Sequence, residues 1–239
     1  IIEANRAVFR NNIIGVEFFP YRDGANPNLS KFTTCRFETT QELFNNTHPG
    51  YGINLSGVNH IDIRGCTFIN SRPDTVGYSS RGGGIYAYNA QFTVGDTTLY
   101  SRIINTDFRG LNYGIRALKS PLGPAQITVT GADFKFNRGG IYLGGFQEGS
   151  PVELKNNTFT MMYQYVPDNQ YGIYLENCSG YKVSLNHVVG NKNAGGEQFG
   201  IIVNNSGPEN NYIYKNYFQD LKVGIQGFNI NRNNDPQAP

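Results

Sequence analysis

The chain has little charge and few of the residues that mark metal-bound or disulfide-bonded scaffolds. Asp, Glu, Lys and Arg make up 16% of its 239 residues, Trp is absent, and Met occurs twice. Three cysteines are too few for a disulfide framework, and their spacing does not match a zinc site. No apolar run approaches the ~20 residues of a membrane-spanning helix. The formal net charge of +2 gives no sign of a polyanion partner. We therefore expect a folded chain with neither membrane insertion nor nucleic-acid binding.

Glycine is abundant, with 29 residues, and it recurs directly before a branched apolar residue. Successive Gly-apolar pairs lie 24 to 37 residues apart, and they begin at Gly15, Gly52, Gly84, Gly114, Gly140, Gly172, Gly200 and Gly224. Upstream of each pair lies a segment that usually ends in phenylalanine, such as "CTF" (66–68). Before most of these lies an alternating segment such as "QITVTG" (126–131). Each unit therefore predicts three short strands separated by turns.

This repeat predicts an all-β fold, a right-handed parallel β-helix of about eight coils with three short strands per coil. Leucine-rich repeats would need regularly spaced leucines, and left-handed β-helices would need a strict six-residue period. The sequence has neither pattern. Glycine before isoleucine is expected to supply a tight turn. The variation in repeat length is expected at one fixed point, the turn that precedes this glycine.

Two inward columns are expected, one of phenylalanine and one of isoleucine. Their members are Phe37, Phe68, Phe108, Phe134, Phe159 and Phe218, and Ile53, Ile85, Ile115, Ile141, Ile173, Ile201 and Ile225. We expect one β-helix domain over residues 1–230, followed by a polar tail over 231–239. Solenoids need capped ends, and no cap is evident before the first strand, so we expect an excerpt of a longer chain.

Four segments within residues 5–95 carry a resemblance to a known group of proteins. They are "AVFRNNIIGVEFFPY", "SKFTTCRFET", "VNHIDIRGCTFIN" and "RGGGIYAYNAQFTV". Together they resemble the right-handed β-helix segments of large secreted and cell-surface proteins of Bacteroidota-type bacteria. The resemblance implies export by the type 9 secretion route and display at, or release from, the cell surface. The expected partners are polysaccharide or cell-surface components, together with the secretion machinery.

The residue after each Gly-Ile pair is expected to face outward and to form a stripe along the solenoid. Five of its members suit ligand binding, namely Asn54, Tyr86, Arg116, Tyr142 and Tyr174. Tyrosine rings at strand spacing suit stacking on sugar rings, while the Arg and Asn side chains suit hydrogen bonds to hydroxyl groups. The other interpretation is structural, because tyrosine favours exposed strands and stacks on cross-strand neighbours.

The residue before the inward phenylalanine is also expected to face outward, which places Asp107 beside Asp133 on the next coil. Their carboxylates would then lie within ~5 Å, near the separation found in retaining glycosidases. Arg109 and Lys135 share this face. The group is compatible with a catalytic acid–base pair, a calcium site, or a neutral surface network.

Cys35 and Cys66 occupy one register on adjacent coils. Parallel Cβ directions favour a stacked pair of buried thiols over a disulfide bond. Cys178 has no partner in register, and the three histidines are dispersed, so no metal site is expected.

The predicted function is a non-catalytic, extracellular or cell-surface scaffold of adhesin type that needs no cofactor and binds polysaccharide along the stripe. One alternative is a polysaccharide lyase or glycoside hydrolase of pectin-lyase-like architecture that uses Asp107 and Asp133, with calcium as its expected cofactor. Another is a secretion-system cargo without activity of its own. Release of reducing ends or unsaturated products from a polysaccharide panel would distinguish the enzyme from the scaffold.

Overall fold

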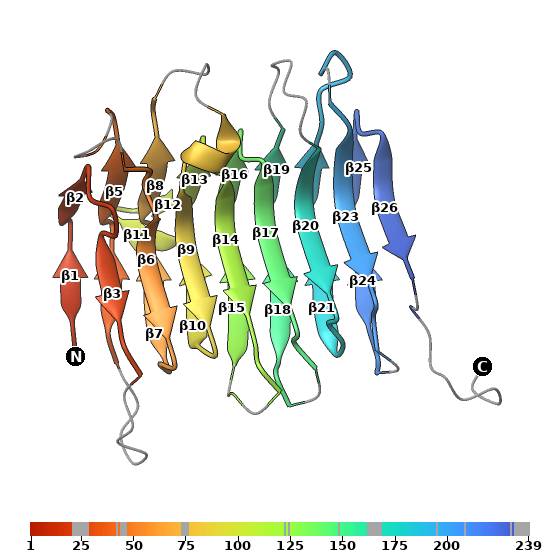
Figure 1. Ribbon diagram of the computed structural model, residues 1–239, viewed down its shortest axis with the longest axis horizontal. Coiled ribbons are helices and arrows are strands. Elements are labelled where there is room, and N and C mark those ends of the chain that lie inside the picture. Colours follow the sequence, from red (N-terminus) through yellow and green to blue (C-terminus); the bar gives the residue numbers. More distant parts are fainter. Residues whose placement is uncertain are drawn as a thin grey trace.

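The computed structural model describes residues 1–20, 29–41, 43, 47–72, 77–121, 123, 125–147, 149–161, 169–194, 196–207, 209–229 and 231. The expected polar tail, apart from Asn231, lies outside these described residues. The strands form three parallel sheets of eight strands each, named sheets A, B and C. The chain visits the three sheets in turn in every coil and advances along one axis, so its first and last strands lie at opposite ends (Figure 1).

The strands of the three sheets have these bounds. Sheet A contains β1 (Glu3–Asn5), β4 (Lys31–Thr33), β7 (Ile61–Arg64), β10 (Gln91–Gly95), β15 (Gln126–Thr130), β18 (Val152–Lys155), β21 (Tyr181–Ser184) and β24 (Tyr212–Tyr214). Sheet B contains β2 (Val8–Arg10), β5 (Arg36–Thr39), β8 (Thr67–Asn70), β13 (Asp107–Arg109), β16 (Asp133–Lys135), β19 (Thr158–Thr160), β22 (His187–Val189) and β25 (Tyr217–Gln219). Sheet C contains β3 (Val16–Phe18), β6 (Tyr51–Ser56), β9 (Gly83–Tyr88), β14 (Tyr113–Leu118), β17 (Gly139–Gly144), β20 (Gln170–Glu176), β23 (Gln198–Asn204) and β26 (Val223–Phe228).

The predicted phenylalanine column exists and forms a continuous stack inside the solenoid. Ring centroids of successive members lie 4.6 to 4.8 Å apart, with interplanar angles of 3° to 9°, and the stacked rings are Phe9, Phe37, Phe68, Phe108, Phe134 and Phe159. Val188 and Phe218 continue the column in the last two strands of sheet B. Burial of these rings and their stacking contacts contribute to the apolar core of each coil.

The isoleucine column is also formed, and it is buried everywhere except at its last member. Ile53 and Ile201 have no exposed surface, whereas Ile225 is 50% exposed. Ile225 keeps its register with Ile201, so it belongs to the column. It is exposed because β26 is the last strand of sheet C and no described strand stacks beyond it.

The role expected for glycine before isoleucine was wrong. These glycines do not adopt the left-handed backbone that a glycine-specific turn requires. A Cβ built on Gly114 would instead lie 2.6 Å from Cδ1 of Phe134 and 2.7 Å from the carbonyl oxygen of Gly140. A Cβ on Gly84 would be crowded by Phe108 in the same way, and one on Gly140 by Phe159. Glycine is therefore required because the phenylalanine stack and the next coil occupy the space of a side chain.

An asparagine ladder holds the turn between sheets A and B. Nδ2 of Asn186 donates to the carbonyl oxygen of Leu154 and to Oδ1 of Asn216, at 2.9 Å in both cases. Oδ1 of Asn186 accepts from the backbone N–H of Asn157 at 3.0 Å. Asn156, directly before Asn157, has a left-handed backbone, with φ of 55°. Each turn thus satisfies buried polar groups of the neighbouring coil, as buried backbone groups require.

The expectation that length variation occurs only before the Gly-Ile pair was also wrong. An antiparallel hairpin of β11 (Thr97–Leu99) and β12 (Arg102–Ile104) is inserted between β10 and β13, at the turn from sheet A to sheet B. It packs back over earlier coils, because the Arg6 guanidinium lies 5.8 Å from the Tyr100 ring centroid. The hairpin pairs with itself, so the three sheets keep their register.

One short helix, the 3₁₀ helix η2 (Tyr78–Ser80), lies in the long turn between β8 and β9. The Tyr78 hydroxyl accepts from Nε2 of Gln170 at 2.9 Å. Gln170 belongs to β20, three strands further along sheet C. Tyr78 of this helix therefore connects distant coils.

Candidate functional site

The five residues predicted to form an outward stripe lie together on the outer face of sheet C. Strand pairing brings them into one continuous register, which runs Asn54, Tyr86, Arg116, Tyr142 and Tyr174. All five side chains are half-buried. Each side chain is positioned by its strand, and each strand is fixed by the inward isoleucine that precedes the outward residue. The sequence pattern alone was sufficient to find this column.

The tyrosine rings of this column pack against neighbouring tyrosine rings. The rings of Tyr142 and Tyr174 stack at 5.4 Å between centroids, with an interplanar angle of 25°. Tyr86 packs against Tyr51, at 5.2 Å and a tilt of 39°. Such stacking covers ring faces, which leaves fewer free faces for a ligand. The structure therefore offers a ligand hydrogen-bonding groups on a stiff support more than it offers free ring faces.

A second aromatic column on the same face was missed by the sequence analysis. Tyr51, Tyr113 and Tyr171 alternate in register with Gly83 and Gly139. A Cβ on Gly83 would lie 2.3 Å from the Tyr51 ring, and one on Gly139 would lie 2.7 Å from the Tyr171 ring. Each of these two tyrosine rings thus covers a glycine of the neighbouring strand, which widens the aromatic surface.

This second column was missed because the strands bend at the glycine before isoleucine. A Cβ on Gly52 would point at Phe68 inside the solenoid, and Ile53 also faces inward. Two consecutive inward positions break the alternation on which the sequence analysis depended. Strict alternation would have turned Tyr51 toward the core. The usable signal was the recurrence of tyrosine directly before Gly-Ile.

Glu176 is an acidic group of this face that the sequence analysis missed, and Glu17, in register with Asn54, is another acidic group on it. The Tyr142 hydroxyl donates to the Glu176 carboxylate, and Nδ2 of Asn204 lies 3.5 Å from Oε1 of Glu176 and 3.3 Å from the Tyr174 hydroxyl oxygen. Burial, together with the Glu176 carboxylate, raises the pKa of Tyr142. Tyr142 therefore stays protonated at neutral pH and acts as a hydrogen-bond donor.

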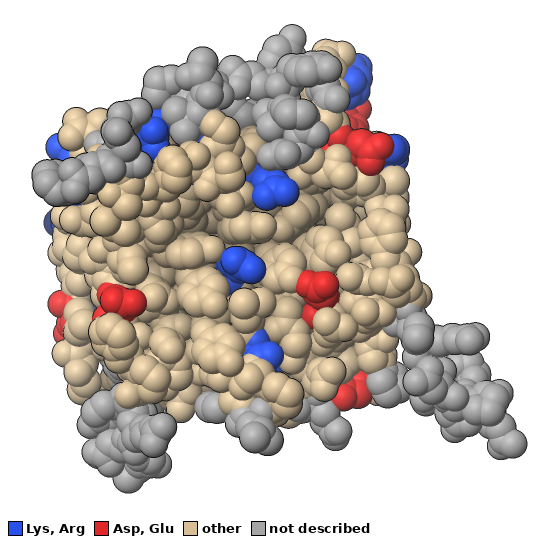
Figure 2. Space-filling model, in the orientation of Figure 1, with Lys and Arg blue, Asp and Glu red and all other residues tan. Residues whose placement is uncertain are grey.

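Arg116 is the positive group at the centre of the face. Its guanidinium lies over the rings of Tyr113 and Tyr142, at 5.6 and 5.7 Å from their centroids. Burial acts to lower the pKa of Arg116, but the neighbouring Tyr51 hydroxyl outweighs it and raises that pKa. The guanidinium is therefore charged at any physiological pH. Figure 2 shows that most of this face is uncharged, with positive side chains near its middle and acidic side chains on either side of them.

A pocket opens beside Tyr51 at the junction of sheets B and C. Its empty volume, which includes space open to solvent, is about 360 Å³. Phe9, Glu38, Tyr51 and Arg81 are among the residues that line it. The pocket therefore adjoins the N-terminal end of the aromatic face.

The proposed catalytic group is a compact ion-pair network on sheet B. The structure places Asp107 opposite Asp133 and Arg109 opposite Lys135, as expected from the repeat. Nζ of Lys135 lies 2.9 Å from Oδ2 of Asp133 and 3.4 Å from Oδ1 of Asp107, and Arg109 contacts Oδ2 of Asp107 at 2.8 Å. Both carboxylates thus have cationic partners. This geometry gives the acids the surroundings of a surface ion network, and their catalytic role stays a prediction.

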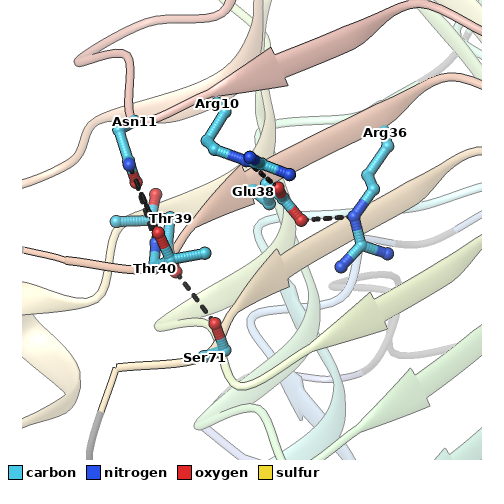
Figure 3. A network of polar contacts seen from close by, with 7 residues as sticks. All are labelled: Arg10, Asn11, Arg36, Glu38, Thr39, Thr40 and Ser71. Atoms are coloured by element: carbon cyan, nitrogen blue, oxygen red, sulfur yellow. Dashed lines mark hydrogen bonds and ion pairs between the residues drawn. The ribbon is translucent and has the colours of Figure 1, made fainter.

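A second charged network lies near the pocket (Figure 3). The carboxylate of Glu38 is held between Arg10 and Arg36, and only 3% of its side-chain surface is exposed. The hydrogen bond from Arg36 lowers the pKa of Glu38, with Arg10 adding to the effect against the opposing cost of burial. Oδ1 of Asn11 accepts from the backbone N–H of Thr40 at 2.8 Å in the adjoining turn. These contacts connect the first two coils.

The cysteines are buried thiols. Cys35 and Cys66 are free and stand in neighbouring coils, and Cys178 is free as well. The Cys35 thiol, aided by burial, raises the pKa of Cys66. Within the part of the chain that the structure describes, no three His, Cys, Asp or Glu residues are placed to hold a metal ion together. The same part of the chain contains no helix with the length and apolarity needed to span a membrane.

Three parallel sheets wound in one direction define the class of this protein as a right-handed parallel β-helix, which confirms the predicted fold. Residues 51–235 match the family described as "Right handed beta helix region", and the chain belongs to that family. No curated protein shows significant sequence similarity to it.

Solved structures with distant similarity to the chain include the following two. One is the Streptococcus pneumoniae surface protein and adhesin PfbA, with 11% identity and a TM-score of 0.41 over 84% of this chain and 67% of that one. The other is QnrB1, a plasmid-mediated fluoroquinolone resistance protein, with 14% identity and a TM-score of 0.23 over 93% and 91% of the two chains. Similarity at this level carries no functional conclusion.

Proposed function

We propose that this chain is a non-catalytic surface scaffold whose outer face of sheet C binds polysaccharide. The observation that carries the proposal is the continuous register of Asn54, Tyr86, Arg116, Tyr142 and Tyr174 across five adjacent strands. The rings support one another and the strands behind them are fixed by buried isoleucines. A ligand would therefore meet a preorganised surface, which lowers the entropic cost of binding.

The polar groups of the face suit a hydroxyl-rich ligand. Arg116 supplies donors, while the Glu176 carboxylate and the hydroxyl oxygen of Tyr142, whose proton goes to Glu176, supply acceptors. Nδ2 of Asn54 donates to Glu17 at 2.8 Å, which holds the Asn54 side chain in place on the same face. Such a mixture of aromatic support and few fixed polar groups is typical of small-molecule and sugar sites.

The cellular setting of this scaffold is part of the same proposal. The resemblance to β-helix segments of Bacteroidota-type surface proteins supports display at the cell surface or secretion, with type 9 secretion as the route. Polysaccharide and other cell-surface components are then the partners. Binding of this kind needs no cofactor.

Glycan binding by the intact protein tests the proposal. Immobilised polysaccharides of neutral and acidic composition would be screened with the wild type and with Tyr86→Ala and Tyr142→Ala. We expect each substitution to lower the affinity by up to about tenfold, since one hydrogen bond contributes ~0.5–1.5 kcal/mol and ~1.4 kcal/mol is a tenfold change in affinity. Tyr212→Ala is the matched control, because Tyr212 is an exposed tyrosine on sheet A.

Two outcomes contradict the proposal. One is the absence of binding to every polysaccharide by a folded wild-type protein. The other is an equal loss of affinity in Tyr212→Ala, which would place the ligand elsewhere. Release of reducing ends or unsaturated products, abolished by Asp107→Asn, would support the enzyme in its place.

A further inference from the structure

Two buried cysteines stand one above the other at the turn between sheets A and B. Cys35 lies between β4 and β5, and Cys66 lies between β7 and β8. The strands pair in register on both sides of this turn, so the two cysteines occupy the same position in adjacent coils. Their exposed fractions are 1% and 0%, and both are free thiols.

The two thiols have equivalent surroundings. Sγ of Cys35 lies 3.3 Å from the carbonyl oxygen of Ala4, and Sγ of Cys66 lies 3.5 Å from that of Phe32. Ala4 and Phe32 are themselves partners in register. Each sulfur also lies near the carbonyl oxygen two residues before it, at 3.6 Å for Cys35 and 3.5 Å for Cys66. The side chains therefore share one conformation, and their sulfur atoms are separated by about the distance between neighbouring strands, ~4.8 Å.

This separation is too long for a disulfide bond and suits a metal ion between the two sulfur atoms. A disulfide would require the sulfurs to approach within ~2.05 Å of each other. A metal–sulfur bond is ~2.3 Å in zinc sites, so two bonds of that length in line span ~4.6 Å. Thiolate ligands select soft ions such as Cu(I), and Cu(I) accepts two sulfur ligands in a linear arrangement. Such an ion fits with both side chains where they are.

The surroundings of the pair favour a complex without net charge. Both cysteines belong to the apolar core, together with Phe32 and Phe68, and an uncompensated charge is costly in such a place. A monovalent ion held by one thiolate and one thiol is neutral. One S–H bond breaks and its proton goes to solvent, while the ion forms a bond to each sulfur. No atom is oxidised or reduced in this step.

We propose that Cys35 and Cys66 form a binding site for a soft monovalent metal ion, Cu(I) in the first place, which connects the second and third coils. The site lies inside the solenoid, so it is independent of glycan binding on the outer face of sheet C. It departs from the sequence-based expectation of no metal site, because linear coordination needs only two ligands.

Cu(I) binding by the full chain tests the proposal. The reduced protein is equilibrated with Cu(I) under anaerobic conditions in competition with a chromophoric Cu(I) chelator. Equilibration is needed because an ion reaches buried thiols only through local opening of the fold. We expect one ion per chain, and X-ray absorption at the copper edge should show two sulfur neighbours. Zn(II) is expected not to displace the copper, since structural zinc sites use four ligands.

Serine variants assign the ion to the pair. Serine keeps a donor for the carbonyl oxygens and removes the sulfur ligand. Cys35→Ser and Cys66→Ser are each expected to lower the affinity for Cu(I) by about a hundredfold or more, because the second ligand of a two-point attachment acts at a high effective concentration.

Cys178→Ser is the matched control and is expected to leave the affinity unchanged. Cys178 is also 1% exposed, and its Sγ lies 3.4 Å from the carbonyl oxygen of Leu143. It follows β20 of sheet C, however, and so does not share the turn of the other two cysteines. Circular dichroism verifies that each variant is folded.

Three outcomes would overturn the inference. They are a folded wild type that binds no Cu(I) after equilibration, copper bound through a single sulfur, and equal losses of affinity in Cys35→Ser and Cys178→Ser. The X-ray absorption measurement uses the wild type, so it decides the matter even if a serine variant does not fold. Failure of this inference leaves glycan binding intact, and failure of the polysaccharide screen leaves the metal site intact.

Discussion

Replacing Gly114 with alanine tests whether glycine before isoleucine makes room for the phenylalanine stack. The new Cβ would lie 2.6 Å from Phe134 Cδ1 and 2.7 Å from the Gly140 carbonyl oxygen. The oxygen belongs to the next coil and has no freedom to move without disturbing strand pairing. Overpacking of this kind costs ~1–3 kcal/mol, and the smaller entropy of the unfolded alanine chain offsets ~0.4–1 kcal/mol. We expect a net loss of about 2 kcal/mol in the free energy of unfolding.

Urea and thermal unfolding followed by circular dichroism measure this loss. For a chain of this size we expect the Tm to fall by roughly 4–8 °C. Gly77→Ala is the matched control, because Gly77 has φ of −57° and only Ser79 Oγ, at 4.0 Å, near its Cβ position. The control should change the stability by less than about 0.5 kcal/mol.

A double-mutant cycle with Phe134→Ala identifies the obstructing group. If the Phe134 ring is the obstacle, Gly114→Ala costs less in the Phe134→Ala background, with a coupling energy of at least ~0.5 kcal/mol. The reasoning is refuted if Gly114→Ala is as stable as the wild type, or if it is no less stable than Gly77→Ala.

Three further predictions concern the polar groups. Asn186→Ala removes the acceptor of two N–H groups of Asn157 and the donor to the Leu154 carbonyl oxygen. We therefore expect the free energy of unfolding, measured in urea, to fall by about 2–4 kcal/mol. A loss smaller than that caused by substituting an exposed asparagine would contradict the role of the ladder. Because the pKa of Glu38 is lowered on folding, its contribution is present above the unfolded pKa of about 4.3 and is lost as pH falls through the folded pKa. Glu38→Gln should therefore show a shallower loss of stability on acidification, measured by unfolding at a series of pH values, and an unchanged slope would contradict it. Asp107→Asn should cost less than about 1 kcal/mol and leave glycan binding unchanged; a large loss of either would mean that the ion network does more than neutralise charge.

The residues that repeat were sufficient to predict the fold. The spacing of phenylalanine and of Gly-Ile pairs identified the three strands of each coil, and stacking of Phe37 on Phe68 follows directly from their shared register. Parallel pairing repeats one side-chain pattern at one position, so a one-dimensional pattern is enough to find the column. The same logic placed Asp107 beside Asp133.

The binding face was only partly predictable. Tyr142 and Tyr174 were found because they follow Gly-Ile at a constant distance. Tyr51 was missed because the backbone bends at Gly52 and breaks the alternation of the strand. The hairpin over residues 97–104 was also missed, because it pairs with itself and leaves no trace in the repeat.

The sequence by itself determined the winding of the chain, the buried columns and the register of the outward residues, since each depends only on spacing along a regular repeat. The tertiary structure decided how side chains of different coils contact one another. It showed that the absence of a side chain at Gly114 leaves room for the Phe134 ring, and that Tyr142 stacks on Tyr174. It also showed that the Arg116 guanidinium lies near the rings of Tyr113 and Tyr142, with Glu176 two strands away. These outcomes depend on the directions and volumes of side chains from different coils, which a spacing pattern does not contain.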